Sequence, residues 1–134
     1  MALVYYAGER TETSHNHTIT GNTITDSGWA GIFIWDTTNT TISNNTISGN
    51  QDGLWFTDSS SAGNVVSQNN FICASAAKTC RSGIWNNMPA GSNINAENNY
   101  WGTTDATVAA GLIHDGVDDS SLGLVDFEPF LLSL

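Results

Sequence analysis

Four stretches of the chain align with one another: NHTITGNTIT (residues 16–25), TTISNNTIS (40–48), NVVSQNNFI (64–72) and NINAENNYW (93–101). They combine β-branched and other apolar residues with Thr, Ser and Asn, which is typical of short strands ended by bends. A second element follows the first three stretches, as GIFIW (31–35), GLWFT (53–57) and GIWNN (83–87). Both elements keep nearly the same period, so the middle of the chain is a tandem repeat.

One asparagine recurs in all four stretches, at Asn22, Asn45, Asn69 and Asn98. Asparagine tolerates the left-handed backbone of a bend, and stacked asparagine side chains hydrogen-bond along a ladder of strands. A single repeat of this kind cannot bury its apolar face alone, but stacked repeats enclose a continuous core. We therefore expect parallel stacked strands, with the asparagines in a structural rather than a catalytic role.

This pattern resembles the right-handed parallel β-helix of pectin-lyase-like proteins, and more narrowly the NosD-like repeats of the carbohydrate-binding-and-sugar-hydrolase grouping. The C-terminal run NNYWGTTDAT…DFEPFLLSL (residues 98–134) resembles the closing module of such proteins. The resemblance implies an all-β solenoid: a short right-handed single-stranded parallel β-helix of about four coils with a small C-terminal helix and strand cap. The expected boundaries are an N-terminal segment or incomplete coil at 1–14, coils at 15–102 and the cap at 103–134.

The cap also has a physical interpretation. Thr104 or Asp105 is a suitable N-cap, and Val108, Leu112 and Ile113 share one face of the helix that would follow. Such a terminal element covers the open end of a solenoid. Since enzymes of the family usually have more coils, we expect a C-terminal piece of a longer protein, or a partner subunit on the open N-terminal end.

Composition excludes several classes of function. The 134 residues include 13 acidic and only 3 basic side chains, for a formal net charge of −10. A nucleic-acid binder needs a basic face, so no nucleic-acid partner is expected. No apolar run approaches the roughly 20 residues that span a bilayer, and no signal peptide is visible at the N-terminus.

Strand alternation predicts an aromatic row. If Ile32, Leu54 and Ile84 point inward, the next residues point outward. These outward residues are Phe33, Trp55 and Trp85. One ring per coil would form a platform for the apolar faces of sugar units. Coverage by a loop and contact with a partner protein are the alternatives.

The third repeat contains a longer connection with both cysteines. Cys73 and Cys80 are close enough in sequence to close a short loop, and we expect a disulfide, which favours an oxidising, extracytoplasmic setting. Lys78 and Arg81 lie in or beside this loop. They are candidates for holding the carboxylate of an acidic sugar; the alternative is that they are ordinary solvated charges.

Catalysis has little support in the sequence. The resemblance implies a basic residue near calcium in lyases, for which Arg81 is the only candidate, and carboxylates on adjacent coils in hydrolases. Asp118 and Asp119 form the only adjacent acidic pair, and they fall in the cap. Four further aspartates are interpreted as turn residues: Asp26, Asp36, Asp52 and Asp58. Whether the chain is an enzyme stays open, and a non-catalytic role is favoured.

A calcium site is the one cofactor alternative. Asp115, Asp118 and Asp119 lie in HDGVDDSS (residues 114–121), whose oxygens suit Ca²⁺, although a turn without an ion explains the same residues. The favoured function is an extracellular or cell-surface carbohydrate-binding or scaffold module with a polysaccharide partner. A structural stalk or self-associating subunit is the alternative, and a fragment of a polysaccharide lyase or glycoside hydrolase comes third.

Overall fold

A computed structural model describes residues 2–4, 14–58, 63–73 and 80–134. Within these residues the chain forms short strands and one short helix, in this order: β1 (Ala2–Val4), β2 (Ser14–His15), β3 (Thr18–Thr20), β4 (Thr23–Thr25), β5 (Ala30–Trp35), β6 (Thr37–Thr38), β7 (Thr41–Ser43), β8 (Thr46–Ser48), β9 (Asp52–Thr57), β10 (Val65–Ser67), β11 (Asn70–Ile72), β12 (Ser82–Asn87), β13 (Ile94–Asn95), α1 (Ala106–Ala110), β14 (Ile113–His114) and β15 (Val125–Asp126).

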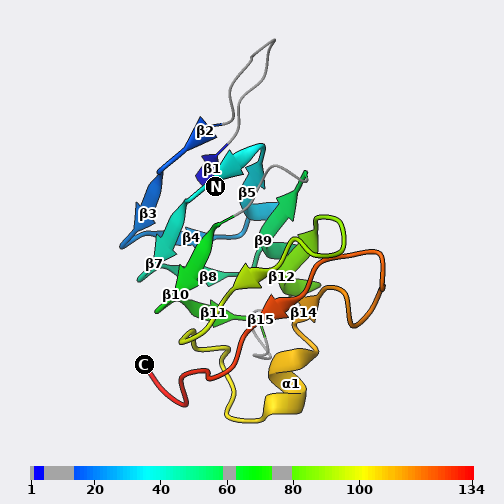
Figure 1. The fold of residues 1–134 in the computed structure, drawn as a ribbon. Coiled ribbons are helices and arrows are strands. Elements are labelled where there is room, and N and C mark those ends of the chain that lie inside the picture. Colours follow the sequence, from blue (N-terminus) through cyan, green and yellow to red (C-terminus); the bar gives the residue numbers. More distant parts are fainter. Residues whose placement is uncertain (1, 5–13, 59–62, 74–79) are drawn as a thin grey trace.

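Equivalent strands of successive repeats pair side by side (Figure 1). The first sheet has the order β1-β5-β9-β12-β14, the second β3-β7-β10-β13-β15 and the third β4-β8-β11, while β2 and β6 form a separate pair. All of these pairings are parallel. Because each repeat places one strand in each large sheet before the next repeat begins, the sheets grow together along one stack.

The registers explain why the core is continuous. Ile32, Leu54, Ile84 and Ile113 occupy equivalent positions in the first sheet, and all are buried. Ile24, Ile47 and Phe71 do the same in the third sheet. Thr23 and Thr25, on either side of Ile24, are exposed, as the two-residue period of a strand requires, whereas Ser48 beside Ile47 is buried. The inward positions predicted for Ile32, Leu54 and Ile84 are confirmed.

The asparagine ladder is confirmed, with one correction. The side-chain oxygen of Asn45 accepts from the backbone N–H and the amide of Asn22, Asn69 does the same for Asn45, and Asn99 does it for Asn69, all at 2.9–3.0 Å. The fourth member is therefore Asn99, and the assignment to Asn98 was wrong by one residue.

The bend and the ladder are made by different residues. Gly21, Asn44, Gln68 and Asn98 precede the ladder asparagines and have the positive φ of the bend. In the second and the last repeats both positions are asparagine, so composition alone does not separate the bend residue from the ladder residue. Glycine or asparagine suits the bend because each tolerates positive φ, whereas the ladder position needs a side chain that both donates and accepts.

The C-terminal segment continues the stack. β14 pairs with β12, and β15 pairs with β13. Asp105 caps α1 by accepting from the backbone N–H groups of Thr107 and Val108, as predicted. The predicted apolar face of this helix was wrong, because α1 ends at Ala110 and Val108 is exposed. Leu112 and Ile113 are buried, but they lie beyond the helix.

Trp101 is packed in the core against Phe71 of the third sheet. Its ring stacks on Phe71 with a centroid distance of 4.6 Å and contacts Phe127 edge-on. Trp101 is fully buried beside Gly83, where an added Cβ would lie 2.8 Å from the indole ring. A glycine is needed there because the indole occupies the space of any side chain. Among the described residues no helix is long and apolar enough to cross a membrane.

Candidate functional site

The predicted aromatic row exists on the outward face of the first sheet. Phe33 pairs with Trp55, and Trp55 with Trp85, in strict register across β5, β9 and β12. His114 of β14 extends the row, since it is the partner of Trp85. The rings of Trp55 and Trp85 are stacked with centroids 5.7 Å apart, and those of Phe33 and Trp55 meet edge-on at 6.1 Å. The alternation of side chains in a strand produces this row.

Trp29 adds a second layer to the row. Its ring centroid lies 4.9 Å from that of Phe33 and 5.0 Å from that of Trp55. Trp29 is 39% exposed, whereas the three rings of the row are half-buried. The surface offered to solvent is therefore stepped, with Trp29 over the first two rings. This residue precedes the strand, so strand alternation alone did not place it.

Arg81 covers the other end of the row. Its guanidinium carbon lies 4.1 Å from the centroid of the Trp85 ring and 5.9 Å from that of Trp55. Such stacking is a cation–π contact. The side chain is 43% exposed, so one face of the guanidinium packs on the ring while part of it stays in contact with solvent. The interpretation of Arg81 as an ordinary solvated charge was wrong.

A buried aspartate holds Arg81 in this position. Asp52 is fully buried, and its carboxylate accepts from Nε of Arg81 at 3.1 Å and from Nη2 at 2.5 Å. The hydroxyl of Ser82 donates to the same carboxylate at 2.6 Å. The interpretation of Asp52 as a turn residue was wrong: it begins β9 and neutralises the guanidinium. Asp26, Asp36 and Asp58 do have the positive φ of bend residues.

Two indole N–H groups in the row are buried without a hydrogen-bond partner in the part of the chain that the structure describes. They belong to Trp55 and Trp85. A buried donor without an acceptor costs roughly 1–3 kcal/mol. The row therefore contains two indole N–H donors without an acceptor, in the two tryptophan rings that stack on each other.

The loop beside the row is closed as expected. Cys73 and Cys80 form a disulfide with Cα atoms 5.0 Å apart. A disulfide is typical of proteins that fold in oxidising compartments. Lys78, the second candidate for binding an acidic sugar, lies outside the described residues.

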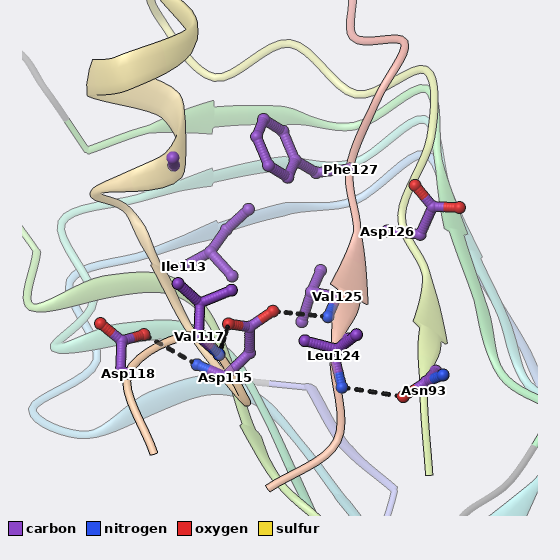
Figure 2. A pocket seen from close by; sticks show the side chains of 10 residues that line it. Asn93, Ile113, Asp115, Val117, Asp118, Leu124, Val125, Asp126 and Phe127 are labelled. Atoms are coloured by element: carbon purple, nitrogen blue, oxygen red, sulfur yellow. Dashed lines mark hydrogen bonds between the residues drawn. The ribbon is translucent and has the colours of Figure 1, made fainter. Parts of the chain in front are cut away.

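The predicted calcium residues are occupied by backbone contacts. The oxygens of Asp115 accept from the N–H groups of Val117 at 2.9 Å and Val125 at 2.6 Å, and Asp118 accepts from the N–H of Asp115 (Figure 2). Asp119 accepts from the N–H and hydroxyl of Ser121, and these bonds lower the pKa of its carboxyl. Across the described ranges, no group of three or more His, Cys, Asp or Glu side chains is arranged to hold a metal ion. The contacts of Asp118 and Asp119 lie within the turn, whereas Asp115 also accepts from β15 through Val125.

The acidic pair considered for hydrolysis lies near the His114 end of the aromatic row, with Oδ2 of Asp118 3.8 Å from Nδ1 of His114. Asp118 and Asp119 follow β14 in the turn before β15, and their side chains serve that turn. Asp52 is buried and paired with Arg81. The structure thus brings together aromatic rings and a paired cation, an arrangement suited to stacking and hydrogen bonding.

Comparison with known families agrees with the fold. The family model described as "Right handed beta helix region" matches residues 5–105, which is most of the chain. This chain belongs to the right-handed β-helix family, and the expectation of a short, all-β, parallel β-helix is confirmed. No curated protein sequence and no solved structure matched the chain.

Proposed function

We propose that this chain is an extracellular carbohydrate-binding β-helix module that acts without catalysis and takes a neutral glycan on the aromatic face of β5, β9 and β12. The observation that carries the proposal is the in-register row Phe33–Trp55–Trp85 with Trp29 exposed at its edge. The centroids of neighbouring rings lie 5.7 and 6.1 Å apart along the stack of strands, and a run of aromatic rings of this kind suits contact with the apolar faces of successive sugar units.

The charges favour a neutral ligand over an acidic one. Asp52 already binds two nitrogens of Arg81, so the guanidinium has lost much of its attraction for a further carboxylate. The whole chain has a formal net charge of −10, which repels polyuronates. Arg81 keeps its place on Trp85 and can donate its remaining N–H groups to sugar hydroxyls.

Native affinity electrophoresis tests this proposal. The purified chain runs in gels that contain xylan, galactomannan, mixed-linkage glucan or polygalacturonate, each with and without calcium. Retardation by at least one neutral polysaccharide, unchanged by calcium, is the expected result. Retardation by polygalacturonate alone would overturn the choice of a neutral ligand, and no retardation in any gel would overturn carbohydrate binding.

Matched variants locate the binding surface. Trp29→Ala removes the exposed ring, and Val65→Ala trims a side chain of similar exposure (38%) on the second sheet. Because an aromatic side chain that is a binding hot spot commonly contributes about 2 kcal/mol or more to an interface, we expect roughly tenfold or greater loss of affinity for Trp29→Ala. Val65→Ala should bind like the parent chain.

The alternative of an assembly interface has a separate readout. Sedimentation velocity across a range of concentrations reports self-association. If Trp29→Ala abolishes an oligomer and the parent chain binds no glycan, the row is a protein interface.

A further inference from the structure

A cavity of about 450 Å³ lies at the C-terminal end of the stack, between β14 and β15 (Figure 2). Ile113 contributes from β14, Val125 from β15 and Phe127 from the residues after it. Ile113 is the last of the equivalent buried residues of the first sheet, which include Ile32, and Val125 pairs with buried Ile94. The cavity is therefore the end of the solenoid interior, and its floor is apolar. Its volume falls in the range of small-molecule sites, about 300–1,000 Å³.

The remaining lining residues give this cavity a negative charge. Asp115, Asp118 and Asp126 all line it, and none of the described residues that line it is Lys or Arg. From Gly102 to Leu134 the sequence contains six acidic residues and no Lys or Arg. Asp115 is only 4% exposed, and the groups that satisfy its oxygens are neutral backbone N–H donors, which orient the carboxylate without neutralising it. Among the described residues, the basic side chain beside these carboxylates is His114, with Nδ1 3.8 Å from Oδ2 of Asp118.

The apolar floor and the acidic rim of the cavity together indicate the chemical class of its ligand. The floor of Ile113, Val125 and Phe127 favours a hydrocarbon body, and carboxylates at the edge favour a cation. A second copy of the chain would bring its own net charge of −10 to this acidic end, which opposes end-to-end stacking. An anionic amphiphile is disfavoured for the same reason.

We propose that the C-terminal cavity binds a small amphipathic cation, an amine or quaternary ammonium carried on an alkyl body. The alkyl body lies against Ile113, Val125 and Phe127, and the ammonium faces Asp118. Asp126 points to the other side of β15 and adds to the negative potential of the rim (Figure 2). This site adjoins the aromatic row at His114, but none of the lining residues named here belongs to the row.

Binding of hexylamine, with hexan-1-ol and hexanoate as shape-matched probes, tests the proposal. Amide signals of Val117, Leu124 and Val125 are followed by NMR during titration into the full chain. We expect these three signals to shift with hexylamine, with at least about tenfold weaker effects from the neutral alcohol and none from hexanoate. Equal binding of the alcohol would overturn the charge argument, and shifts confined to Trp29, Trp55 and Trp85 would overturn the location.

Two variants make the test specific. Asp118→Asn with Asp126→Asn removes two charges at the rim and keeps the shape, so it should weaken hexylamine roughly tenfold. Asp26→Asn with Asp36→Asn removes the same charge in the first repeat, where asparagine suits the positive φ, and should leave affinity unchanged.

Ala110→Lys supplies an independent check. Ala110 is an exposed lining residue at the end of α1, so its substitution should not disturb the core. The introduced side chain brings its own alkyl stem and ammonium to the mouth, and hexylamine binding should fall at least about tenfold. Undiminished binding in Ala110→Lys, or a concentration-dependent dimer that this variant abolishes, would overturn the proposal.

Discussion

The asparagine ladder makes a quantitative prediction about the stability of the stack. Asn69 is fully buried, and its amide group has partners in the repeats on both sides. Its oxygen accepts from the backbone N–H and the amide of Asn45, and its nitrogen donates to the carbonyl of Ile42 at 2.8 Å and to the side-chain oxygen of Asn99 at 3.0 Å. The variant Asn69→Ala removes all of these contacts at once.

The magnitude follows from the groups left without partners. Three buried groups lose their contact with Asn69: the backbone N–H of Asn45, its side-chain amide and the carbonyl of Ile42. At roughly 1–1.5 kcal/mol for each unsatisfied buried group, the free energy of unfolding falls by about 3–5 kcal/mol. For a domain of this size, that loss lowers Tm by roughly 10–20 °C.

Asn22→Ala is the matched control. Asn22 stands at the exposed end of the same ladder, where its amide donates to Thr20 and Asn45. Water replaces these contacts, so we expect a loss below about 1 kcal/mol. Urea unfolding followed by far-UV circular dichroism measures both variants. If Asn69→Ala and Asn22→Ala differ by less than about 1 kcal/mol, the ladder does not stabilise the stack and the reasoning is refuted.

Three further predictions concern the site and the turns. Arg81→Met leaves the carboxylate of Asp52 buried beside Ser82 without its cation, so the free energy of unfolding measured by chemical denaturation should fall by about 2–4 kcal/mol. An unchanged denaturation midpoint would contradict the stabilising role of the ion pair. Reducing the Cys73–Cys80 disulfide, which spans seven residues in sequence, should cost about 2–3 kcal/mol from loop entropy, measured by calorimetry with and without dithiothreitol. Hydrogen bonds from Ser121 lower the folded-state pKa of Asp119, so this carboxyl stabilises the fold above its unfolded-state pKa and loses that contribution as pH falls through the folded-state pKa. In a profile of Tm against pH, Asp119→Asn should therefore reduce the fall of Tm at acid pH. An unchanged acid part of the profile would exclude the contribution.

The repeat explains why so much of the fold was predictable. Period-two alternation determined that Ile32 points inward and Phe33 outward, and the same alternation applied to every equivalent strand. The disulfide was predictable from local spacing. The ladder position was predicted correctly in three repeats and wrongly in the fourth. Adjacent asparagines fill the bend and the ladder positions in the second and fourth repeats, and composition does not separate the two requirements.

The candidate site was only partly predictable, since some of its contacts join distant residues. Asp52 and Arg81 are 29 residues apart and meet because β9 and β12 are neighbours. Trp29 lies outside the strand pattern, yet it packs over Phe33 and Trp55. The short helix was predicted to end later than it does, because Leu112 and Ile113 are apolar for packing into the core rather than for forming a helical face.

By itself, the sequence determined the class of fold, which side chains of β5, β9 and β12 point inward or outward, and the excess of acidic residues. These properties depend on local periodicity and composition, and the same periodicity recurs in every repeat. Only the tertiary structure decided which outward rings are covered, which charge pairs with Arg81, and that an apolar cavity with an acidic rim lies between β14 and β15. Those features depend on side chains from separate repeats that meet only when the strands stack.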